Sequence, residues 1–351
     1  MSKLPFVVQL TIQDLLDHRI GLRKESLKII CFLAKSTLQE VLDRKKALFE
    51  HYRYSPTKLQ DIEGYQLWKF SRPRPSALEN FYALHTPENY VFLMSKMPSK
   101  AFKWRLIPFA KELYPDLVRV YASSEELRSF LALLQERLGR SLLYNSVVMK
   151  RLFGARDQFT DVYFGRLDRP FQDAFRTASS RGSWVDFIQV HDDRPEELIV
   201  SVSRGGLVSV RKGNFEQIAD CILFPLMSKG GERYKFLSNR DRHTKPERQI
   251  SPFFVRYDES LFDKPEVIVR LRDVIQSYRH CYYTVVHSGN PYLYMAVMDT
   301  LDNSAFSIRT LRDDALLVVP QVRATADSLT RFHRYLSEEF REGTLEEAKV
   351  L

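Results

Sequence analysis

Apolar side chains recur at steps of three and four residues near the start of the chain. The positions that follow this spacing are Leu27, Ile30, Cys31, Ala34, Leu38, Val41, Leu42 and Leu48. Such spacing is typical of the buried face of an amphipathic helix, and it predicts one long helix from Ser26 to about Glu50. Thr11, three residues before Asp14, adds a capping pattern for a shorter preceding helix. We therefore expect residues 1–60 to form a helical N-terminal region.

After residue 60 the pattern changes to short apolar runs separated by breakers. Pro73 and Pro75 fix their own backbones and favour extended conformations before them, so a linker or exposed arm is expected there. Ser123 with Glu126 forms a capping box, and Gly139 is placed to end the helix that this box begins. The predicted strands lie within 78–95, 117–121 and 142–149, and a further helix within 100–114. Residues 61–150 are therefore expected to form a small mixed α/β domain.

Turn residues separate short runs of β-branched and aromatic side chains in the remainder of the chain. An antiparallel meander of strands followed by a helix is predicted twice, at 184–227 and at 282–340. Thr325 is placed to cap the second of these helices. A basic loop is expected at 229–249, and residues 151–351 together are expected to form an antiparallel α+β domain. The fold class predicted for the chain is α+β, with a helical N-terminal arm, a small mixed α/β domain and a C-terminal domain of meanders each followed by a helix.

Composition narrows the class of protein. The 351 residues are 44% apolar and hold 53 Lys and Arg against 44 Asp and Glu, a net charge of +9, which favours a packed core over a disordered chain. No apolar stretch approaches the roughly 18 residues that a membrane span needs, and the first residues lack the pattern of a secretory signal. A cytoplasmic protein is therefore expected. The three cysteines are widely spaced and match neither a disulfide framework nor a zinc site, so free thiols and no cofactor are expected.

Signature motifs of several enzyme classes are absent. The sequence contains no GxxxxGK[ST], GxSxG or HExxH, and no GxGxxG that follows a predicted strand, which weighs against nucleotide-hydrolysing motors, serine hydrolases, zinc proteases and dinucleotide enzymes. The best enzymatic alternative is His287 with Asp299 and Asp302, which neighbouring strands would bring to one end of a sheet. An imidazole and two carboxylates suit Mg²⁺ or Mn²⁺, as in a metal-dependent phosphodiesterase or nuclease. Ordinary turn chemistry explains the same residues without a site.

The positive charge is distributed unevenly along the chain. Residues 251–351 carry 12 basic and 15 acidic side chains, so the excess lies ahead of them, and a polyanion would meet the first two thirds of the chain. In the predicted basic loop, Tyr234 and Phe236 supply rings on which unstacked bases would stack. The expected nucleic-acid contacts are Arg72 and Arg74 in the proline-containing arm, Arg204, Arg211 and Lys212 at a glycine hairpin, and Arg233, Lys235, Arg240, Arg242, Lys245 and Arg248 in the loop.

These features favour a non-enzymatic subunit of a larger intracellular complex that binds the phosphate backbone of DNA or RNA. Protein partners are expected as well, and membrane contact is not. A protein–protein adaptor without nucleic-acid contact is the first alternative, because the predicted helix at 26–50 and an acidic helix near the C-terminus would each dock on a partner. The phosphodiesterase is the second alternative.

Overall fold

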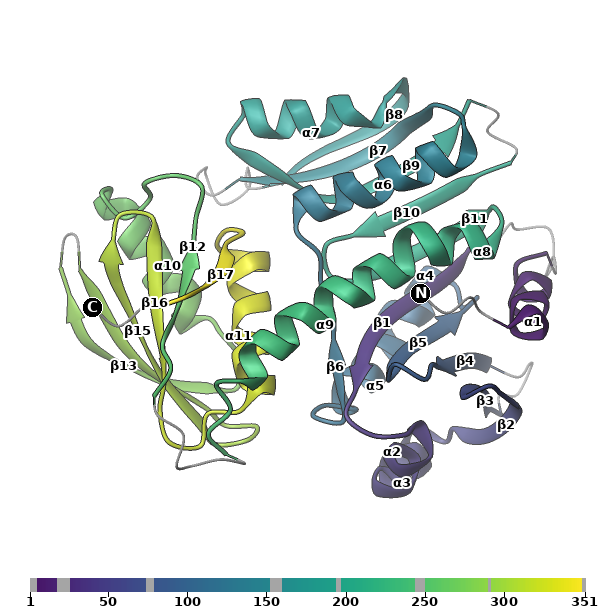
Figure 1. Cartoon of the computed structure of the whole chain (residues 1–351), viewed down its shortest axis with the longest axis horizontal. Helices are drawn as coiled ribbons and strands as arrows, with labels where there is room; N and C mark the ends of the chain where they lie inside the picture. The colour runs from purple at the N-terminus through teal and green to yellow at the C-terminus, as the bar shows by residue number, and fades with distance from the viewer. Residues whose placement is uncertain are drawn as a thin grey trace. The chain divides into compact units, whose positions relative to one another are not determined.

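The computed structural model describes residues 5–17, 26–73, 79–151, 160–193, 197–243, 250–289 and 292–348 (Figure 1). The chain forms two compact units, Met1–Gly230 (unit 1) and Gly231–Leu351 (unit 2). Three of the expected nucleic-acid contacts, Arg74, Lys245 and Arg248, lie outside the described residues.

Unit 1 is built from an antiparallel sheet with helices on both faces. The helices are α1 (Phe6–Asp17), α2 (Leu38–Arg44), α3 (Lys46–Tyr52), α4 (Ser99–Ala101), the π-helix η1 (Phe102–Leu106), α5 (Ile107–Glu112), α6 (Ser124–Leu138), α7 (Phe171–Ser180), α8 (Phe215–Ile218), the π-helix η2 (Ala219–Leu223) and α9 (Phe224–Ser238), which contains the boundary between the units. The strands are β1 (Leu27–Ala34), β2 (Ser55–Ile62), β3 (Tyr65–Arg72), β4 (Glu79–His85), β5 (Tyr90–Ser95), β6 (Leu117–Arg119), β7 (Leu142–Arg151), β8 (Thr160–Pro170), β9 (Ser183–Asp192), β10 (Ile199–Ser203) and β11 (Leu207–Lys212).

The strands of this sheet follow the order β2-β3-β4-β5-β1-β11-β10-β9-β7-β8, with β6 also paired to β1. The central strand β1 is buried on both faces, because successive side chains of a strand point to opposite sides. Ile29 and Cys31 join one apolar core, under α6, α7 and α8. Ile30 and Phe32 join the other, under α2, α3, η1 and α5.

The long helix predicted from Ser26 to Glu50 is wrong. Residues 27–34 form β1, which pairs with β5 and β11, and the helical part of the segment is divided into α2 and α3. A continuous apolar run fits helical spacing and a strand buried on both faces equally well. The β-branched pair Ile29 and Ile30 favours the strand, and the neighbouring strands decide the outcome.

The capping signals at Ser123, Gly139 and Thr325 are confirmed, whereas the one at Thr11 is wrong, because Thr11 lies inside α1 (Phe6–Asp17) and does not begin it. Ser123 accepts a hydrogen bond from the Glu126 amide at 3.0 Å, and the Glu126 carboxylate accepts one from the Ser123 amide at 2.8 Å, so α6 begins with a capping box. Gly139 ends α6 in the left-handed conformation. Thr325 accepts a hydrogen bond from the Ser328 amide at the start of α11 (Ala326–Glu339).

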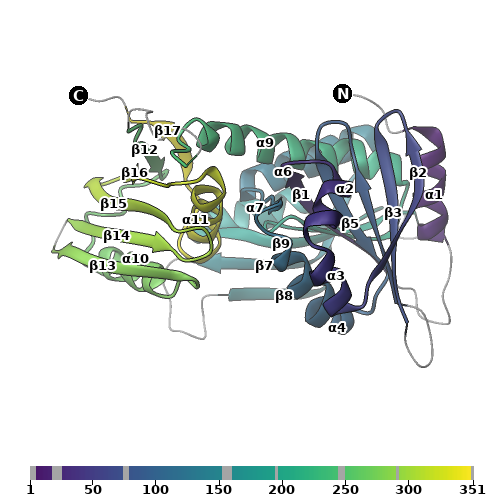
Figure 2. The same cartoon turned by 90° about the horizontal axis from the view of Figure 1, so that it is seen from below.

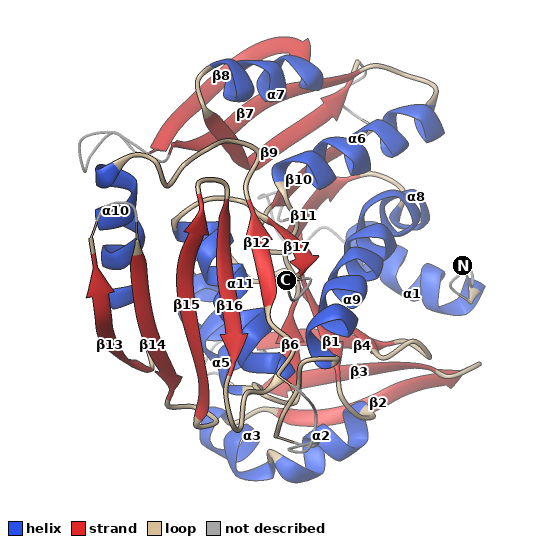
Figure 3. Cartoon of the chain, turned by 60° about the vertical axis from the view of Figure 1, so that its left-hand side comes forward, coloured by secondary structure: helices blue, strands red, loops and turns tan. Residues whose placement is uncertain are grey.

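Unit 2 holds a second antiparallel sheet, with strand order β13-β14-β15-β16-β12-β17 (Figure 2). The strands are β12 (Phe253–Arg256), β13 (Cys281–Ser288), β14 (Leu293–Asp299), β15 (Ser304–Arg312), β16 (Ala315–Pro320) and β17 (Thr344–Glu347). Helices α10 (Pro265–Gln276) and α11 lie on the same side of the sheet, behind it in Figure 3. The ring centres of Phe332 on α11 and Phe306 on β15 are 4.7 Å apart in the core between them.

The predicted α+β class is confirmed, and both sheets are antiparallel. The basic loop expected at 229–249 is only partly a loop, because residues 229–238 belong to α9. The boundary between the two units, at residues 230 and 231, differs from the boundaries of the predicted regions 1–60, 61–150 and 151–351. One strand from each region, β1, β5 and β11, meets at the centre of a single sheet. Among the described residues, no helix combines the length and apolar character needed to span a bilayer.

Candidate nucleic-acid interface

The basic residues expected to bind nucleic acid differ in how far they reach solvent. Arg72 ends β3 with its side chain half-buried, and its guanidinium lies 5.9 Å from the centre of the Tyr54 ring. Arg211 is exposed at the end of β11, and Lys212 beside it is half-buried.

The glycine hairpin between β10 and β11 is part of the core of unit 1. Arg204 is only 1% exposed, and its guanidinium lies 5.5 Å from the Trp184 ring. The Arg204 amide donates to the Asp186 carbonyl at 2.9 Å, and the Gly206 amide donates to the Ser203 carbonyl at 3.1 Å. These groups therefore stabilise the fold and do not present donors to a phosphate in solvent.

Arg240, expected in the basic loop, is buried in unit 2 with 3% of its surface exposed. Its guanidinium lies 3.7 Å from the centre of the Phe236 ring, donates to the Phe236 carbonyl at 2.6 Å and pairs with Glu347 at 2.8 Å. The arginine thus covers one face of the Phe236 ring, and that face is not available to a base. A buried guanidinium needs partners of this kind to offset its lost hydration.

The neighbouring candidates in unit 2 are also tied into the fold. Tyr234 donates to Asp327 at 3.0 Å, and burial together with that carboxylate raises the pKa of the phenol far above its ordinary value. The Arg242 amide donates to the Ala324 carbonyl at 2.7 Å. Arg233 is half-buried, and Lys235 is the one exposed side chain among the described basic candidates from 233 to 242.

His287 does not meet the two aspartates of the predicted metal site. In the β13–β14 pair, His287 lies opposite Tyr294, whereas Asp299 lies opposite Cys281 at the other end. Five residues along a strand separate these positions by about 17 Å. The described residues contain no group of three His, Cys, Asp or Glu side chains that would hold a metal ion.

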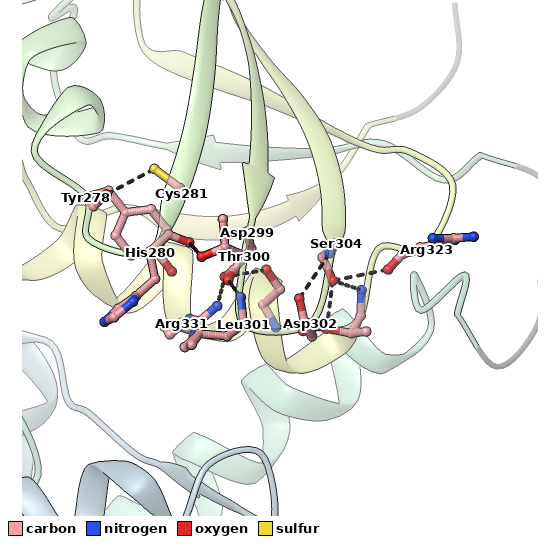
Figure 4. A network of polar contacts seen from close by, with 12 residues as sticks. Tyr278, His280, Cys281, Asp299, Thr300, Leu301, Asp302, Ser304, Arg323 and Arg331 are labelled. Atoms are coloured by element: carbon pink, nitrogen blue, oxygen red, sulfur yellow. Dashed lines mark hydrogen bonds and ion pairs between the residues drawn. The ribbon is translucent and has the colours of Figure 1, made fainter.

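Asp299 and Asp302 instead tie the β14–β15 turn to the start of α11 (Figure 4). Asp299 is fully buried, forms an ion pair with Arg331 and accepts a hydrogen bond from Ser328 Oγ at 2.9 Å. Asp302 accepts from the Ser304 amide at 3.1 Å and from Thr325 Oγ1 at 2.6 Å. These contacts are those of turn and cap residues, which matches the alternative without a catalytic site.

The structure shows a basic, aromatic surface in unit 1 that the sequence patterns above did not single out. From Lys96 to Lys111 the sequence holds five basic residues and no acidic one. Trp104 in the middle of this segment is 68% exposed. Lys100 and Lys103 are exposed beside it, with the Lys103 ammonium 5.8 Å from the Trp104 ring. We call Lys100, Lys103, Trp104 and Arg105 the Trp104 surface.

Local chemistry explains why Trp104 points outward. Phe102 and Leu106 are buried under the sheet, so the residues between them face solvent. The turn that carries them is the π-helix η1, followed by Pro108 in the first turn of α5. Proline has no amide hydrogen and clashes with the carbonyl four residues earlier in an α-helix, and a widened turn accommodates it. π-Turns of this kind are frequent at functional sites.

Buried contacts hold the Trp104 surface in place. The Lys28 ammonium on β1 donates to the Met97 carbonyl at 2.7 Å and lies 5.8 Å from the Phe102 ring. Arg105 pairs with the buried Glu79 on β4 at 2.9 Å. Glu79 lies opposite Arg72 in the β3–β4 ladder. The fold thus brings one expected contact, Arg72, to the same sheet end as the Trp104 surface.

A sequence signal for this surface existed in the acid-free run from Lys96 to Lys111. Helical spacing over 100–114 predicts a helix there, whereas the net charge of longer segments averages this run with acidic neighbours. The exposure of Trp104 itself follows from tertiary packing, because tryptophan is more often largely buried.

Comparison with known proteins gives no family for this chain. No protein-family model matches the sequence, and no curated protein was found to be related to it.

Proposed function

We propose that the protein binds single-stranded or unpaired nucleic acid, DNA or RNA, through the Trp104 surface, without catalysing a reaction on it. The observation that carries this proposal is the exposed Trp104 ring flanked by Lys100, Lys103 and Arg105 in a segment free of acidic residues. Bases stack on exposed aromatic rings whatever their sequence, and nearby cations follow the backbone.

The proposed mechanism has two parts. Lys100 and Lys103 replace condensed counterions on phosphates, which makes the affinity fall with salt. Trp104 stacks on a base that is not paired in a duplex, which gives a preference for single strands. Arg105 pairs with Glu79 and holds the turn in shape, while the two lysines are exposed at the surface. Arg72, near the same sheet end, extends the positive surface.

The proposal also includes a cellular compartment and membership of a larger complex. The free thiols of Cys31, Cys221 and Cys281 suit a reducing compartment, so we place the protein in the cytoplasm. Membership of a larger complex stays part of the proposal. The adaptor alternative loses one of its two supports, because residues 26–50 do not form one amphipathic helix. Its other support, the acidic C-terminal segment, is partly neutralised by Arg240 and Arg256.

Binding to short fluorescent oligonucleotides at low ionic strength tests the proposal. Trp104→Ala is expected to weaken binding to single strands by about 1–3 kcal/mol, the range for loss of one stacked base, which is at least about fivefold in Kd. Lys100→Ala/Lys103→Ala is expected to lower the slope of log affinity against log salt by about 1.4 on single strands. Fluorescence anisotropy measures both, on DNA, RNA and duplex probes.

The matched control removes the same charge elsewhere. Lys264 and Arg279 are exposed in unit 2, and Lys264→Ala/Arg279→Ala is expected to leave affinity and salt slope close to those of the parent. The proposal is contradicted if the parent protein binds none of the probes at low salt. Equal binding by the parent and the Trp104 and lysine variants contradicts the location of the interface.

A further inference from the structure

Strand β13 ends the sheet of unit 2 and is exposed along almost its whole length. Every residue from Tyr282 to Ser288 is exposed, with Tyr282 at 69% and Val286 at 54%. The strand carries apolar and aromatic side chains, Tyr282, Tyr283, Val285 and Val286, and residues 281–288 include no Lys, Arg, Asp or Glu. An edge strand of this composition offers unpaired backbone donors and acceptors to another strand.

The other edge strands contain residues that discourage such pairing. Strand β2 includes Pro56, Lys58 and Asp61, and proline and charged residues are the usual protection of an edge. The sequence of β8 includes Asp161, Arg166, Asp168 and Arg169. Strand β17, at the opposite edge of the unit 2 sheet, has four residues, of which Glu346 and Glu347 pair with Arg256 and Arg240. Of these edges, β13 alone lacks charge.

We propose that β13 is a dimerisation strand, which pairs antiparallel with β13 of a second copy of this chain and joins the two unit 2 sheets across a twofold axis. The regular part of the strand runs from Cys281 to Val285, since the register with β14 shifts after Val285. A twofold axis at Tyr283 sets the two Tyr283 side chains against each other and each Tyr282 against Thr284. Aromatic and β-branched pairs of this kind stabilise antiparallel strands.

Charge identifies a second copy as the partner. The net charge of +9 lies in residues 1–230, whereas residues 231–351 hold 18 basic and 18 acidic side chains, so two copies that meet through the uncharged β13 bring neutral units together and avoid the repulsion that contact between their basic units would cause. The pairing also closes on itself. Once two β13 strands are joined, the remaining edge of each unit 2 sheet is β17, which has only four residues and carries charged side chains, both of which discourage further pairing, so the assembly ends at two chains.

The oligomeric state of the full chain, freed of nucleic acid by nuclease and high salt, tests this proposal. The parent is expected to have a mass of about 82 kDa by light scattering, twice the 41.2 kDa of one chain. Thr284→Lys places a charge on the exposed edge and is expected to give the single-chain mass with an unchanged circular dichroism spectrum. Ala296→Lys is the matched control, because Ala296 is exposed on β14 directly opposite Thr284, and this variant is expected to stay dimeric.

Hydrogen exchange adds a local readout. Of the amides from Tyr282 to Val285, the alternate ones that face away from β14 are expected to exchange slowly in the parent and faster in Thr284→Lys, because their hydrogen bonds exist only in the dimer. A parent of single-chain mass overturns the proposal. It is also overturned if Ala296→Lys dissociates the dimer as readily as Thr284→Lys, since the contact would then use the sheet face, or if neither variant dissociates it. Should Thr284→Lys fail to fold, Val285→Lys, which is exposed and lies in the same paired segment, takes its place. None of these outcomes depends on nucleic-acid binding.

Discussion

Burial of His333 on α11, together with the nearby positive charge of Arg233, lowers the pKa of its imidazole to about 3. The neutral ring donates from Nε2 to the Gly343 carbonyl at 3.1 Å. In the unfolded chain the same imidazole binds a proton below its ordinary pKa of 6.5. Between about pH 6.5 and pH 3 the imidazole is therefore protonated in the unfolded state and neutral in the folded state. The free energy of unfolding falls as the pH is lowered through this range.

His333→Gln is expected to reduce this acid sensitivity. At pH 5 the parent loses about 2 kcal/mol through His333, from the 1.36 kcal/mol that each pKa unit represents, and the variant lacks this loss. Chemical unfolding at pH 7.5 and pH 5 measures the difference. His243→Gln is the control, because His243 is exposed, and it is expected to keep the parent's pH dependence. An undiminished loss in His333→Gln contradicts the assignment.

At the same scale, basic residues of similar sequence context have opposite roles. Arg204 and Arg240 are buried in aromatic surroundings and hold their own units together, whereas Lys100 and Lys103 face solvent beside Trp104. Arginine suits the buried, structural role because its planar guanidinium stacks on aromatic rings and donates several hydrogen bonds to carbonyls and carboxylates. Counting charge along a sequence does not separate these cases, because exposure depends on what packs over each residue.

Among the elements, the β10–β11 turn contains a glycine that the fold requires for steric reasons and not for binding a phosphate. Gly206 has a φ of 71°, and a Cβ added to it would collide with the carbonyl oxygen of Val120. Gly206→Ala is therefore expected to destabilise the protein by about 2–4 kcal/mol, from backbone strain and overpacking together. Thermal unfolding measures the loss, and oligonucleotide affinity of the folded fraction is expected to stay at the parent's value.

Gly182→Ala provides the comparison. Gly182 has a similar φ of 60°, but an added Cβ there meets no atom within 4 Å, so only the backbone term of about 1 kcal/mol is expected. Equal losses in the two variants would mean that the contact with Val120 has no energetic role. A selective loss of oligonucleotide affinity in Gly206→Ala would support the hypothesis that the β10–β11 hairpin binds phosphate.

On the scale of the whole molecule, the two units carry very different charge. Residues 231–351 hold 18 Lys and Arg against 18 Asp and Glu, so the entire net charge of +9 belongs to residues 1–230. We therefore expect a polyanion to be attracted to unit 1, which holds the Trp104 surface. The neutral unit 2 holds the uncharged strand β13, and the proposed functions of binding and pairing therefore fall on different units.

Photochemical cross-linking of the full chain tests this division. A single-stranded oligonucleotide with a photoreactive base is expected to label peptides of unit 1, foremost the one that contains Trp104, because zero-length cross-links form at stacked rings. Digestion and mass spectrometry locate the label. Labelling concentrated in α9 beyond Gly231, or elsewhere in unit 2, would contradict the placement and favour the basic loop expected from the sequence.

Local sequence signals determined the α+β class, the start of α6 at Ser123 and its end at Gly139, and the meander from β13 to β16 with its capped helix α11. These depend on neighbouring residues, which the sequence shows directly. Only the tertiary structure decided that residues 27–34 form a central strand, that Arg204 and Arg240 are buried, and that His287 is far from Asp299. Strand pairing and burial depend on residues distant in the chain, and one apolar run or one arginine satisfies several such environments. The outward position of Trp104 and the open edge of β13 were decided in the same way.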